Sequence, residues 1–364
     1  MRVLMLTDLS SYHSIRWFKM LERQGIDIWA FSFEKPLIEH EKFLYFKKGM
    51  IPQRLRYTLG VIDLKKVIRK IKPDLLHPHQ IACYGWLCFL ANEGLPVFLV
   101  SWGEGIFRTP KKSPFHKLLT KLIIKNSDFL FVDAYFMKEI VMKEFGYPSS
   151  KIMVDVMGPD EEVYNHEIKE FKSIDTFKFV TYRRLEPSLH PLLPLKAFKK
   201  FVEIYPNSKL FILSGGSMEG KVREFIYKNG LFDRVEYLGR VSNEKLWEIL
   251  SDCHFYISPS PIDSTSVSLL EAFSFGLIPI VTNIPGNREW VIDGINGFLF
   301  EPGKYSDLLR KMIEAVNMDL DKINQIRKLN KEIVLKKANL NGVISKVIKV
   351  METLVFNRKR WKKR

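Results

Sequence analysis

The chain has 364 residues, of which 46% are hydrophobic and 27% are charged. This length allows two hydrophobic cores, and the composition excludes an intrinsically disordered chain. Its three cysteines fit neither a disulfide framework nor a zinc-binding spacing, and no apolar run approaches the ~20 residues that span a bilayer. We therefore expect a soluble protein of the reducing cytoplasm.

The formal net charge of +16 needs an explanation of its own. Basic residues gather in residues 54–72, in residues 105–125 and at the C-terminal end. An anionic membrane surface is one partner that such clusters suit, at ~1 kcal/mol for each basic residue, and simple solvation is the alternative. We do not expect nucleic acid, because the sequence has no zinc-finger, RNP or helix-turn-helix pattern.

Short apolar runs alternate with segments of helical periodicity along the whole chain. This alternation predicts an α/β fold of parallel sheets that helices cover on both faces. We expect two doubly wound domains, at residues 1–165 and 170–340. In residues 341–364 an apolar stripe predicts a long helix, which a basic tail follows. The expected strands lie at residues 3–6, 28–33, 75–76, 97–100, 129–132, 153–154, 177–182, 210–213, 235–238, 253–257 and 277–281.

The stretch from Ser258 to Phe300 carries the most specific pattern. An expected strand meets a Pro/Ser/Asp loop at Ser258, and a helix is predicted from Val267 to Phe275. The N–H groups and the positive dipole end at such a helix start suit a phosphate. Glu271 in the early turns suits sugar hydroxyls; alternatively, it forms a capping box with Ser268 and only fixes the helix start.

Two carboxylates in this stretch, Asp263 and Glu271, have seven residues between them. Gly276, Pro279, Gly286, Asn287, Glu289 and Gly297 follow at fixed distances. The pattern resembles the Glu-x7-Glu signature of the retaining GT-B glycosyltransferases of family 4 (glycosyl transferases group 1). The resemblance implies two facing Rossmann-like domains, the first for the acceptor and the second for a nucleotide sugar, with a C-terminal helix that crosses back to the first.

The resemblance also implies the roles of single residues. Glu271 would hold the ribose of the donor, Asp263 the hydroxyls of its sugar, and Arg184 its pyrophosphate, with neither a metal nor a cofactor. A surface ion pair is the alternative for Arg184. Asp263 stands where the family has glutamate; it also suits a turn or an N-cap. The family's second cation, a lysine, is replaced by Leu189, and we expect Arg183 or His190 to compensate.

Further residues are assigned by their place after expected strands. A Gly-Gly turn permits the backbone to approach a ligand closely. In the family, the segment that matches residues 239–241 contacts the base of the nucleotide. The further donor-binding residues are Gly216, Arg240, Val241, Ser264, Thr265, Ser266 and Val267. A loop of hydroxyls that opens a helix suits phosphate or an acceptor. We therefore expect Ser10, Ser11, His13 and Arg16 to bind the acceptor or a phosphate; a solvated position on the helix is the alternative for His13. Trp102 and Gly103 fall where many relatives have His-Gly, and the resemblance assigns them to the acceptor site, Trp102 for shape and stacking only.

The function expected from these residues is transfer of a hexose from a nucleotide-diphosphate sugar to a hydroxyl acceptor. The acceptor would be a lipid-linked or cell-surface glycan precursor at the cytoplasmic face of the membrane. Asp263, Leu189 and Trp102 depart from the family pattern and favour an alternative, a non-catalytic protein of the same fold that binds sugar nucleotides or glycans. A sugar-nucleotide epimerase is a second alternative.

Overall fold

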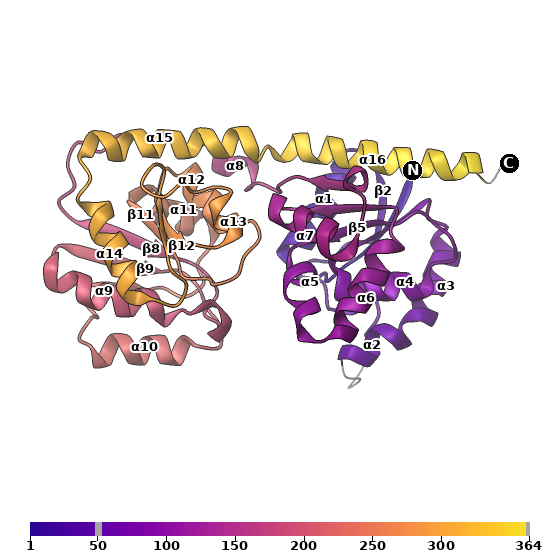
Figure 1. Ribbon diagram of the computed structural model, residues 1–364, viewed down its shortest axis with the longest axis horizontal. Helices are drawn as coiled ribbons and strands as arrows, with labels where there is room; N and C mark the ends of the chain where they lie inside the picture. Colours follow the sequence, from indigo (N-terminus) through magenta and orange to yellow (C-terminus); the bar gives the residue numbers. More distant parts are fainter. Residues whose placement is uncertain (48–52, 362–364) are drawn as a thin grey trace. The chain divides into compact units, whose positions relative to one another are not determined.

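The computed structural model describes residues 1–47 and 53–361 and divides into two compact units (Figure 1). The first unit combines the chain up to Asp155 with the segment from Asn341, and the second runs from Val156 to Leu340. Residues 362–364 of the expected basic tail lie outside the described residues.

The described residues of the first unit form seven parallel strands. They are β1 (Arg2–Leu6), β2 (Asp27–Ser32), β3 (Phe43–Tyr45), β4 (Leu75–Pro78), β5 (Phe98–Ser101), β6 (Phe129–Val132) and β7 (Ile152–Val154). Their order is β3-β2-β1-β4 followed by β5-β6-β7, and single bridges, such as that between His79 and Val100, join β4 to β5. Leu4 and Leu6 of β1 join one core cluster, as the period of two requires for one face of a sheet.

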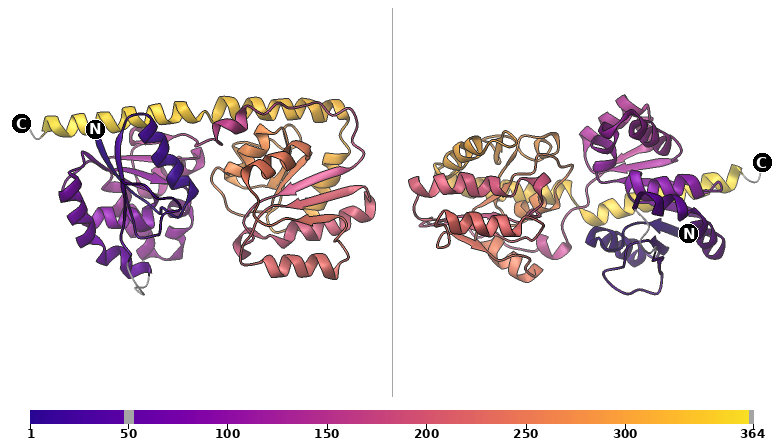
Figure 2. Two further views of the ribbon diagram at one scale, coloured as in Figure 1. Left: turned by 180° about the vertical axis from the view of Figure 1, so that it is seen from behind. Right: turned by 90° about the horizontal axis from the view of Figure 1, so that it is seen from below.

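Helices cover this sheet on both faces (Figure 2). The α-helices are α1 (Tyr12–Arg23), α2 (Gln53–Leu59), α3 (Val61–Ile71), α4 (Trp86–Ala91), α5 (Glu104–Phe107), α6 (Pro114–Lys125), α7 (Tyr135–Phe145) and α16 (Leu340–Trp361). A π-helix, η1 (Gln80–Gly85), and two 3₁₀ turns, η2 (Thr109–Lys112) and η3 (Ser149–Lys151), connect them. α16 buries Val343, Val347 and Met351, which accounts for the predicted apolar stripe.

The second unit contains one parallel sheet. Its strands are β8 (Phe177–Thr181), β9 (Ser208–Ile212), β10 (Val235–Tyr237), β11 (Phe255–Ser258), β12 (Ile278–Thr282) and β13 (Phe298–Phe300). The order is β10-β9-β8-β11-β12-β13, so the chain moves outward from β8 to one edge and then returns to place β11 on the other side of β8. The strand order therefore reverses between β8 and β11, as in doubly wound folds.

The helices of the second unit form two cores, one on each face of the sheet. They are α8 (Glu161–Tyr164), α9 (Leu192–Ile204), α10 (Glu219–Lys228), α11 (Asn243–Asp252), α12 (Val267–Ser274), α13 (Pro285–Arg288), α14 (Tyr305–Val316), α15 (Leu320–Lys337) and the 3₁₀ turn η4 (Pro187–Leu189). Phe255 and Ile257 face the core with α9 and α14, whereas Tyr256 faces the core with α11 and α12. This alternation gives β11 its continuous apolar sequence.

The predicted α/β alternation is found, and the structure adds details that the sequence did not indicate. The two strands β3 and β13 were not predicted. The second unit begins at Val156, so residues 156–165 belong to it and not to the first domain as expected. The reason is α8, where Val163 joins a core of the second unit and the Tyr164 hydroxyl donates to the carbonyl of Ala338 at 2.5 Å.

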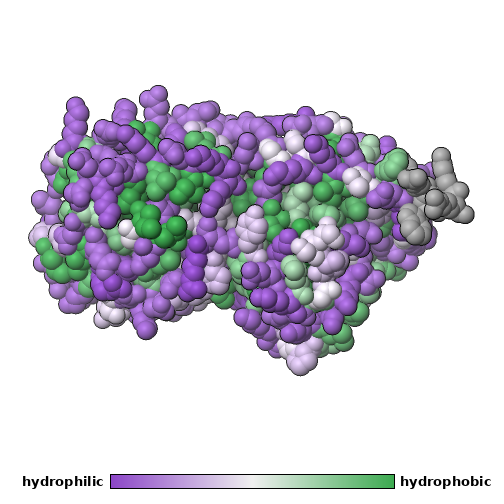
Figure 3. All heavy atoms as spheres, turned by 45° about the horizontal axis from the view of Figure 1, so that its top comes forward, coloured by the Kyte–Doolittle hydropathy of each residue, from purple (hydrophilic) through white to green (hydrophobic). Residues whose placement is uncertain are grey.

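The surface is mainly hydrophilic on the face that Figure 3 presents, with hydrophobic side chains in smaller patches. Among the described residues, no helix combines the length and the apolar character that crossing a bilayer requires. Some large apolar side chains are nevertheless exposed, and three of them, Phe115, Leu118 and Leu122, lie on α6.

Candidate functional site

The carboxyl ends of β8 and β11 lie side by side where the strand order of the second unit reverses. Strand pairing sets Phe255 beside Phe179 and Tyr256 beside Val180, so the segments after both strands leave the same edge of the sheet. Residues 182–184 follow β8, and residues 259–266 join β11 to α12. Ligands of open parallel α/β sheets bind at this position.

Arg183 is the basic side chain that reaches from the β8 segment to the loop after β11. Its Nη2 atom lies 2.6 Å from Oδ2 of Asp263, and its Nη1 atom donates to Oγ of Ser266 at 2.8 Å. Burial disfavours the charged guanidinium and so lowers the pKa of Arg183, whereas the negative charge of Asp263 raises it. The net effect is a raised pKa. The charged guanidinium therefore fixes the shape of this loop.

Arg184, the arginine that the sequence analysis placed at the pyrophosphate, has a different environment. Its side chain is 71% exposed, and its Nη2 atom lies 3.7 Å from Oε1 of Glu186. The structure thus brings Arg183, and not Arg184, against Asp263. Two adjacent arginines after a strand give no signal in the sequence that tells which one turns toward the neighbouring loop.

The start of α12 is built from hydroxyl side chains. Ser264, Thr265 and Ser266 are buried, and Ser266 is the N-cap residue in an extended conformation. Oγ of Ser268 shares a hydrogen bond of 2.8 Å with the hydroxyl of Tyr256. The helix begins at Val267, so Ser268 lies inside the first turn, and the capping box of Ser268 and Glu271 does not form.

Glu271 lies one turn into α12 and is half-buried. Burial, and then the negative charge of Glu271, raise the pKa of Tyr182, the residue that follows β8. The Tyr182 hydroxyl donates to the carbonyl of Ser268 in the first turn of the same helix. Glu271 therefore lies at the same sheet edge as the Arg183–Asp263 pair.

Several glycines of the sequence pattern support the loop and do not line an open space. A Cβ atom on Gly286 would lie 2.0 Å from the carbonyl oxygen of Ser264, and one on Gly297 would lie 2.4 Å from the ring of Pro279. Gly216 has the same constraint, because a Cβ atom there would lie 2.5 Å from the carbonyl oxygen of Leu185. The close approach that Gly216 permits is therefore to protein backbone.

The segments after β9 and β10 meet at the same edge of the sheet. Arg240 is exposed and Val241 is half-buried, and a Cβ atom on Gly215 would lie 3.4 Å from the Arg240 side chain. These residues follow strands on one side of β8, as predicted for the donor site, whereas Ser264 to Val267 follow β11 on its other side.

His190 occupies a backbone conformation that favours glycine, with φ of 53°. It follows η4, whose last residue is Leu189, and lines a pocket of about 310 Å³ with Lys196. The pocket also contacts Gly303 from the loop between β13 and α14, and Tyr305, the first residue of α14. His190 and Lys196 thus set two basic side chains near the position where the expected lysine is missing.

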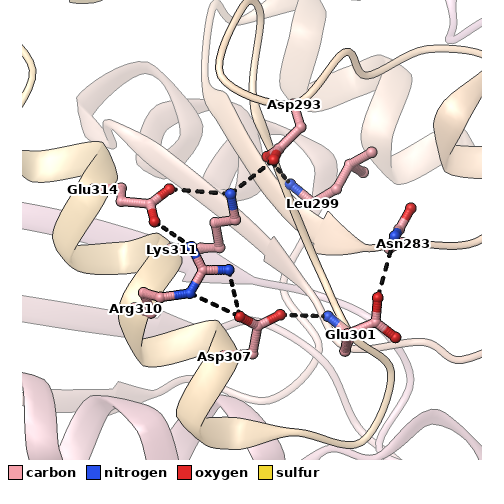
Figure 4. A network of polar contacts seen from close by, with 8 residues as sticks. All are labelled: Asn283, Asp293, Leu299, Glu301, Asp307, Arg310, Lys311 and Glu314. Carbon is pink, nitrogen blue, oxygen red and sulfur yellow. Dashed lines mark hydrogen bonds and ion pairs between the residues drawn. The ribbon is translucent and has the colours of Figure 1, made fainter.

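A polar network holds the loop that borders this pocket (Figure 4). Oδ2 of Asp307 accepts from the N–H of Glu301 at 2.8 Å, and Oδ1 of Asp307 lies 2.6 Å from Nη2 of Arg310. Nζ of the buried Lys311 lies 2.8 Å from Oδ2 of Asp293 and 3.0 Å from Oε2 of Glu314. The network ties α14 to the segments on either side of β13.

In the first unit, the predicted hydroxyl loop lies between β1 and α1. The Ser10 hydroxyl donates to Oδ1 of Asp8 at 2.6 Å, and Ser11 is the N-cap residue of α1, without a hydrogen bond from its side chain to the cap. His13 is exposed, whereas Arg16 is buried. The structure therefore gathers these residues at the carboxyl end of β1, but it points Ser10 to a neighbouring side chain.

Trp102 and Gly103 follow β5 in the same unit. The ring of Trp102 packs edge-on against Trp17 at 5.5 Å, and Gly103 has φ of 103°, which a side chain would disfavour. Nε1 of Trp17 donates to Nε2 of the buried His77 at 2.8 Å. Trp102 thus belongs to a packed cluster of rings at the ends of β4 and β5, where it contributes shape.

Comparison with known proteins gives a consistent family. Residues 165–333 match the glycosyl transferases group 1, and residues 2–134 match the glycosyl transferase 4-like group. An uncharacterized glycosyltransferase of Methanocaldococcus jannaschii is 30% identical over 265 residues, which cover 72% of this chain and 69% of that protein. The UDP-Gal:alpha-D-GlcNAc-diphosphoundecaprenol alpha-1,3-galactosyltransferase of Escherichia coli is 25% identical, with coverage of 81% and 79%.

Solved structures agree on the fold. The sucrose-phosphate synthase of Thermosynechococcus elongatus has a TM-score of 0.81 at 15% identity and covers 97% of this chain, with 98% of its own chain aligned. An Anabaena protein solved in complex with UDP has a TM-score of 0.79 at 14% identity and covers 97% of this chain, with 100% of its own aligned. The chain therefore belongs to the glycosyltransferases and has the GT-B fold.

Proposed function

We propose that this glycosyltransferase moves a hexosyl group from a nucleoside diphosphate sugar to a hydroxyl group of a lipid-linked glycan, with retention of the anomeric configuration. The name of the E. coli relative describes a galactosyl transfer from UDP-Gal to a sugar on diphosphoundecaprenol, and the Anabaena protein was solved with UDP. These two names support the classes of acceptor and donor.

The observation that carries the donor assignment is the contact of Arg183 with Asp263 beside the start of α12. The first N–H groups of a helix have no partner within the helix, and the dipole there favours an anion. Arg183 holds the preceding loop in place through Asp263 and Ser266. The diphosphate of the donor would bind at this helix start, with Arg184, exposed at the same edge, as its second cation.

The proposed reaction breaks the bond between the anomeric carbon and the β-phosphate oxygen. The electron pair of that bond leaves with the nucleoside diphosphate, and the acceptor oxygen forms the new bond to the anomeric carbon. The acceptor proton passes to the departing phosphate oxygen. We propose that fixed positive potential from the guanidinium groups and the helix dipole stabilises the leaving charge without a metal ion or a cofactor.

The two carboxylates have separate roles in binding the donor. Glu271, which lies beside Tyr182, would accept hydrogen bonds from the ribose, and Asp263 would orient the hexose through its second oxygen while Arg183 holds the first. The first unit would bind the acceptor. The free thiols of Cys83, Cys88 and Cys253 support a reducing compartment, so we place the reaction at the cytoplasmic face of a membrane.

Calorimetric titration of the full-length protein with UDP, GDP and ADP tests the donor assignment. We expect one nucleoside diphosphate to bind and the corresponding sugar nucleotides to support transfer to a sugar on a polyprenyl diphosphate. Absence of binding by all three nucleotides would overturn the proposal. Binding without transfer or hydrolysis would instead indicate a binding protein, and a changed sugar in the recovered nucleotide would indicate an epimerase.

A further inference from the structure

The first unit contains a pocket of about 800 Å³ that the predicted site residues do not line. Its walls come from the segments that follow β4 and β5, from the end of α2 and from one side of α6. The residues after β4 are Gln80, Ala82 and Cys83, and those after β5 are Glu104 and Gly105. The pocket therefore opens beside the carboxyl ends of parallel strands, where α/β folds bind ligands.

The backbone of one wall is unusual. Gln80 has φ of 75°, which a residue with a side chain rarely adopts, and it begins the π-helix η1. A strained backbone costs free energy and persists only where the surrounding fold holds it in place. Strained residues and π-helical turns are therefore found frequently at functional sites. Gly105 packs against Ile81, since a Cβ atom there would lie 2.9 Å from the Ile81 side chain. These features shape the wall.

The interior of the pocket is mainly apolar and aromatic. α6 contributes Phe115, Leu119 and Ile123, and Trp86 and Tyr57 contribute rings from α4 and α2. The volume of the pocket lies within the range of roughly 300–1,000 Å³ that is typical of small-molecule sites. The lining also includes the hydrogen-bonding side chains of Thr58, Gln80, Thr109 and Thr120, but apolar atoms make up the larger part of its surface.

The charge around the pocket is positive on the α6 side. Residues 105–125 contain no acidic residue, and Lys112 and His116 from this segment line the pocket. Lys112 has no ion-pair partner within residues 1–47 and 53–361. Glu104 also lines the pocket, but its Oε1 atom lies 3.8 Å from Nη1 of Arg108, which offsets its charge. An anionic group would therefore be stabilised at the Lys112 side.

An apolar stripe on the outside of α6 continues this character. Phe115, Leu118 and Leu122 are 65%, 53% and 39% exposed, and their spacing puts them on one face of the helix. Phe115 belongs to both the stripe and the pocket wall. Leu118 and Leu122 do not line the pocket, so this part of the stripe is not assigned to the lipid.

We infer that this pocket binds the hydrocarbon chain of a polyprenyl phosphate or diphosphate, with the phosphate beside Lys112 and His116. The inference rests on the proposed function, because it identifies this lipid as the carrier of the acceptor glycan. It assigns the lipid to residues separate from the predicted acceptor residues Ser10 to Arg16. The acceptor would then be selected by its lipid as well as by its sugar.

Titration of the full-length protein with geranylgeranyl diphosphate, below the concentration at which it forms micelles, tests the site. Leu119→Trp fills the pocket from α6, and Ala82→Trp fills it from η1, where Ala82 is exposed and its replacement leaves the core unchanged. We expect each variant to bind the lipid at least about tenfold more weakly, because a bulkier side chain overpacks the occupied pocket. Leu118→Trp, on the exposed stripe, is the matched control and should bind like the wild-type protein.

Two further ligands separate the chain from its head group. Geranylgeraniol should retain part of the affinity, inorganic pyrophosphate should bind weakly, and Lys112→Met should reduce binding of the diphosphate but not of the alcohol. The inference is overturned if the wild-type protein does not bind the lipid, or if both pocket variants bind it unchanged. Vesicle binding that Leu118→Trp alters and Leu119→Trp does not would also overturn it, in favour of a membrane surface.

Titration with nucleoside diphosphates on the same samples keeps the two proposals distinguishable. Lipid binding without any nucleotide binding would leave the pocket in place and contradict the proposed donor. Nucleotide binding and sugar transfer in the absence of lipid binding would contradict the pocket alone. In the expected result, Leu119→Trp keeps the nucleotide affinity of the wild-type protein and loses that for the lipid.

Discussion

Nη2 of Arg183 lies 2.6 Å from Oδ2 of Asp263, and this ion pair joins the segments that follow two neighbouring strands of the second unit. The two side chains are only 20% and 17% exposed, so water screens the pair weakly. The same guanidinium donates to Ser266, the N-cap residue of α12. A positioned carboxylate and a helix start are thus held by one cation.

Arg183→Met should destabilise the protein by about 3 kcal/mol, because it leaves a partly buried carboxylate without its partner. Urea unfolding measures this change. Arg184→Met is the matched control for stability and should change it by less than about 0.5 kcal/mol, since Arg184 is exposed. In the double variant Arg183→Met with Asp263→Asn, the two losses should be less than additive.

The same pair of variants tests the proposed donor site. Arg184→Met should keep its stability but weaken nucleoside diphosphate binding by about tenfold or more, because a charged hydrogen bond contributes about 1.5–3 kcal/mol. Calorimetric titration gives the affinity. Unchanged binding by Arg184→Met would remove Arg184 from the donor site and leave Arg183 as its cation.

Glu271→Gln should weaken nucleoside diphosphate binding by about tenfold or more, since the amide replaces a charged acceptor. The fold should persist, because Glu271 is half-buried and the N-cap of α12 is Ser266. Glu248→Gln, at a side chain that is 68% exposed on α11, controls for the loss of a negative charge. Equal nucleotide affinities of both variants would contradict the ribose role.

Gly286→Ala should destabilise the protein by about 1–3 kcal/mol and weaken nucleotide binding, because the new Cβ atom would overlap the carbonyl of Ser264. Gly220→Ala is the matched control, since a Cβ atom there has nothing within 4 Å. Gly220 lies in α10, where alanine should stabilise by up to about 1 kcal/mol. Thermal unfolding measures both, and a neutral Gly286→Ala would show that the loop shifts without cost.

His254 makes stability depend on pH. Burial, followed by the positive charges of Arg327 and Lys178, lowers its pKa from 6.5 to about 4 in the folded state. The unfolded chain therefore takes up a proton first as the pH falls. The stabilisation is fully present above pH 6.5 and is lost as the pH falls toward about 4, with about 1 kcal/mol lost between roughly pH 7.5 and pH 5.5.

His254→Asn should reduce this loss, because it removes the titrating group. Nδ1 of His254 accepts a hydrogen bond of 3.1 Å from the N–H of Lys178, and an asparagine oxygen can replace it. Urea unfolding at both pH values measures the difference. The assignment is wrong if this variant loses as much stability on acidification as the wild-type protein.

The sequence predicted the layers of the fold because apolar runs such as those of β8 and β11 are buried on both faces and carry a clear signal. It predicted α12, with Glu271 in its early turns, from the helical signals between Val267 and Phe275. It did not distinguish Arg183 from Arg184, because the direction of a side chain after a strand depends on contacts with a distant loop. The pocket beside α6 was also missed, since its walls come from segments far apart in the chain, although the basic and aromatic residues of α6 were noticed.

The division of the chain between the two units determines how they can be studied separately. The second unit is one continuous segment, Val156–Leu340, so it can be produced as a fragment for nucleotide titrations. A fragment that stops at Asp155 would lack α16 and expose the partners of Val347 and Met351 to water. Isolating the first unit therefore requires a circular permutation or a linker that rejoins residues 341–361 to its body.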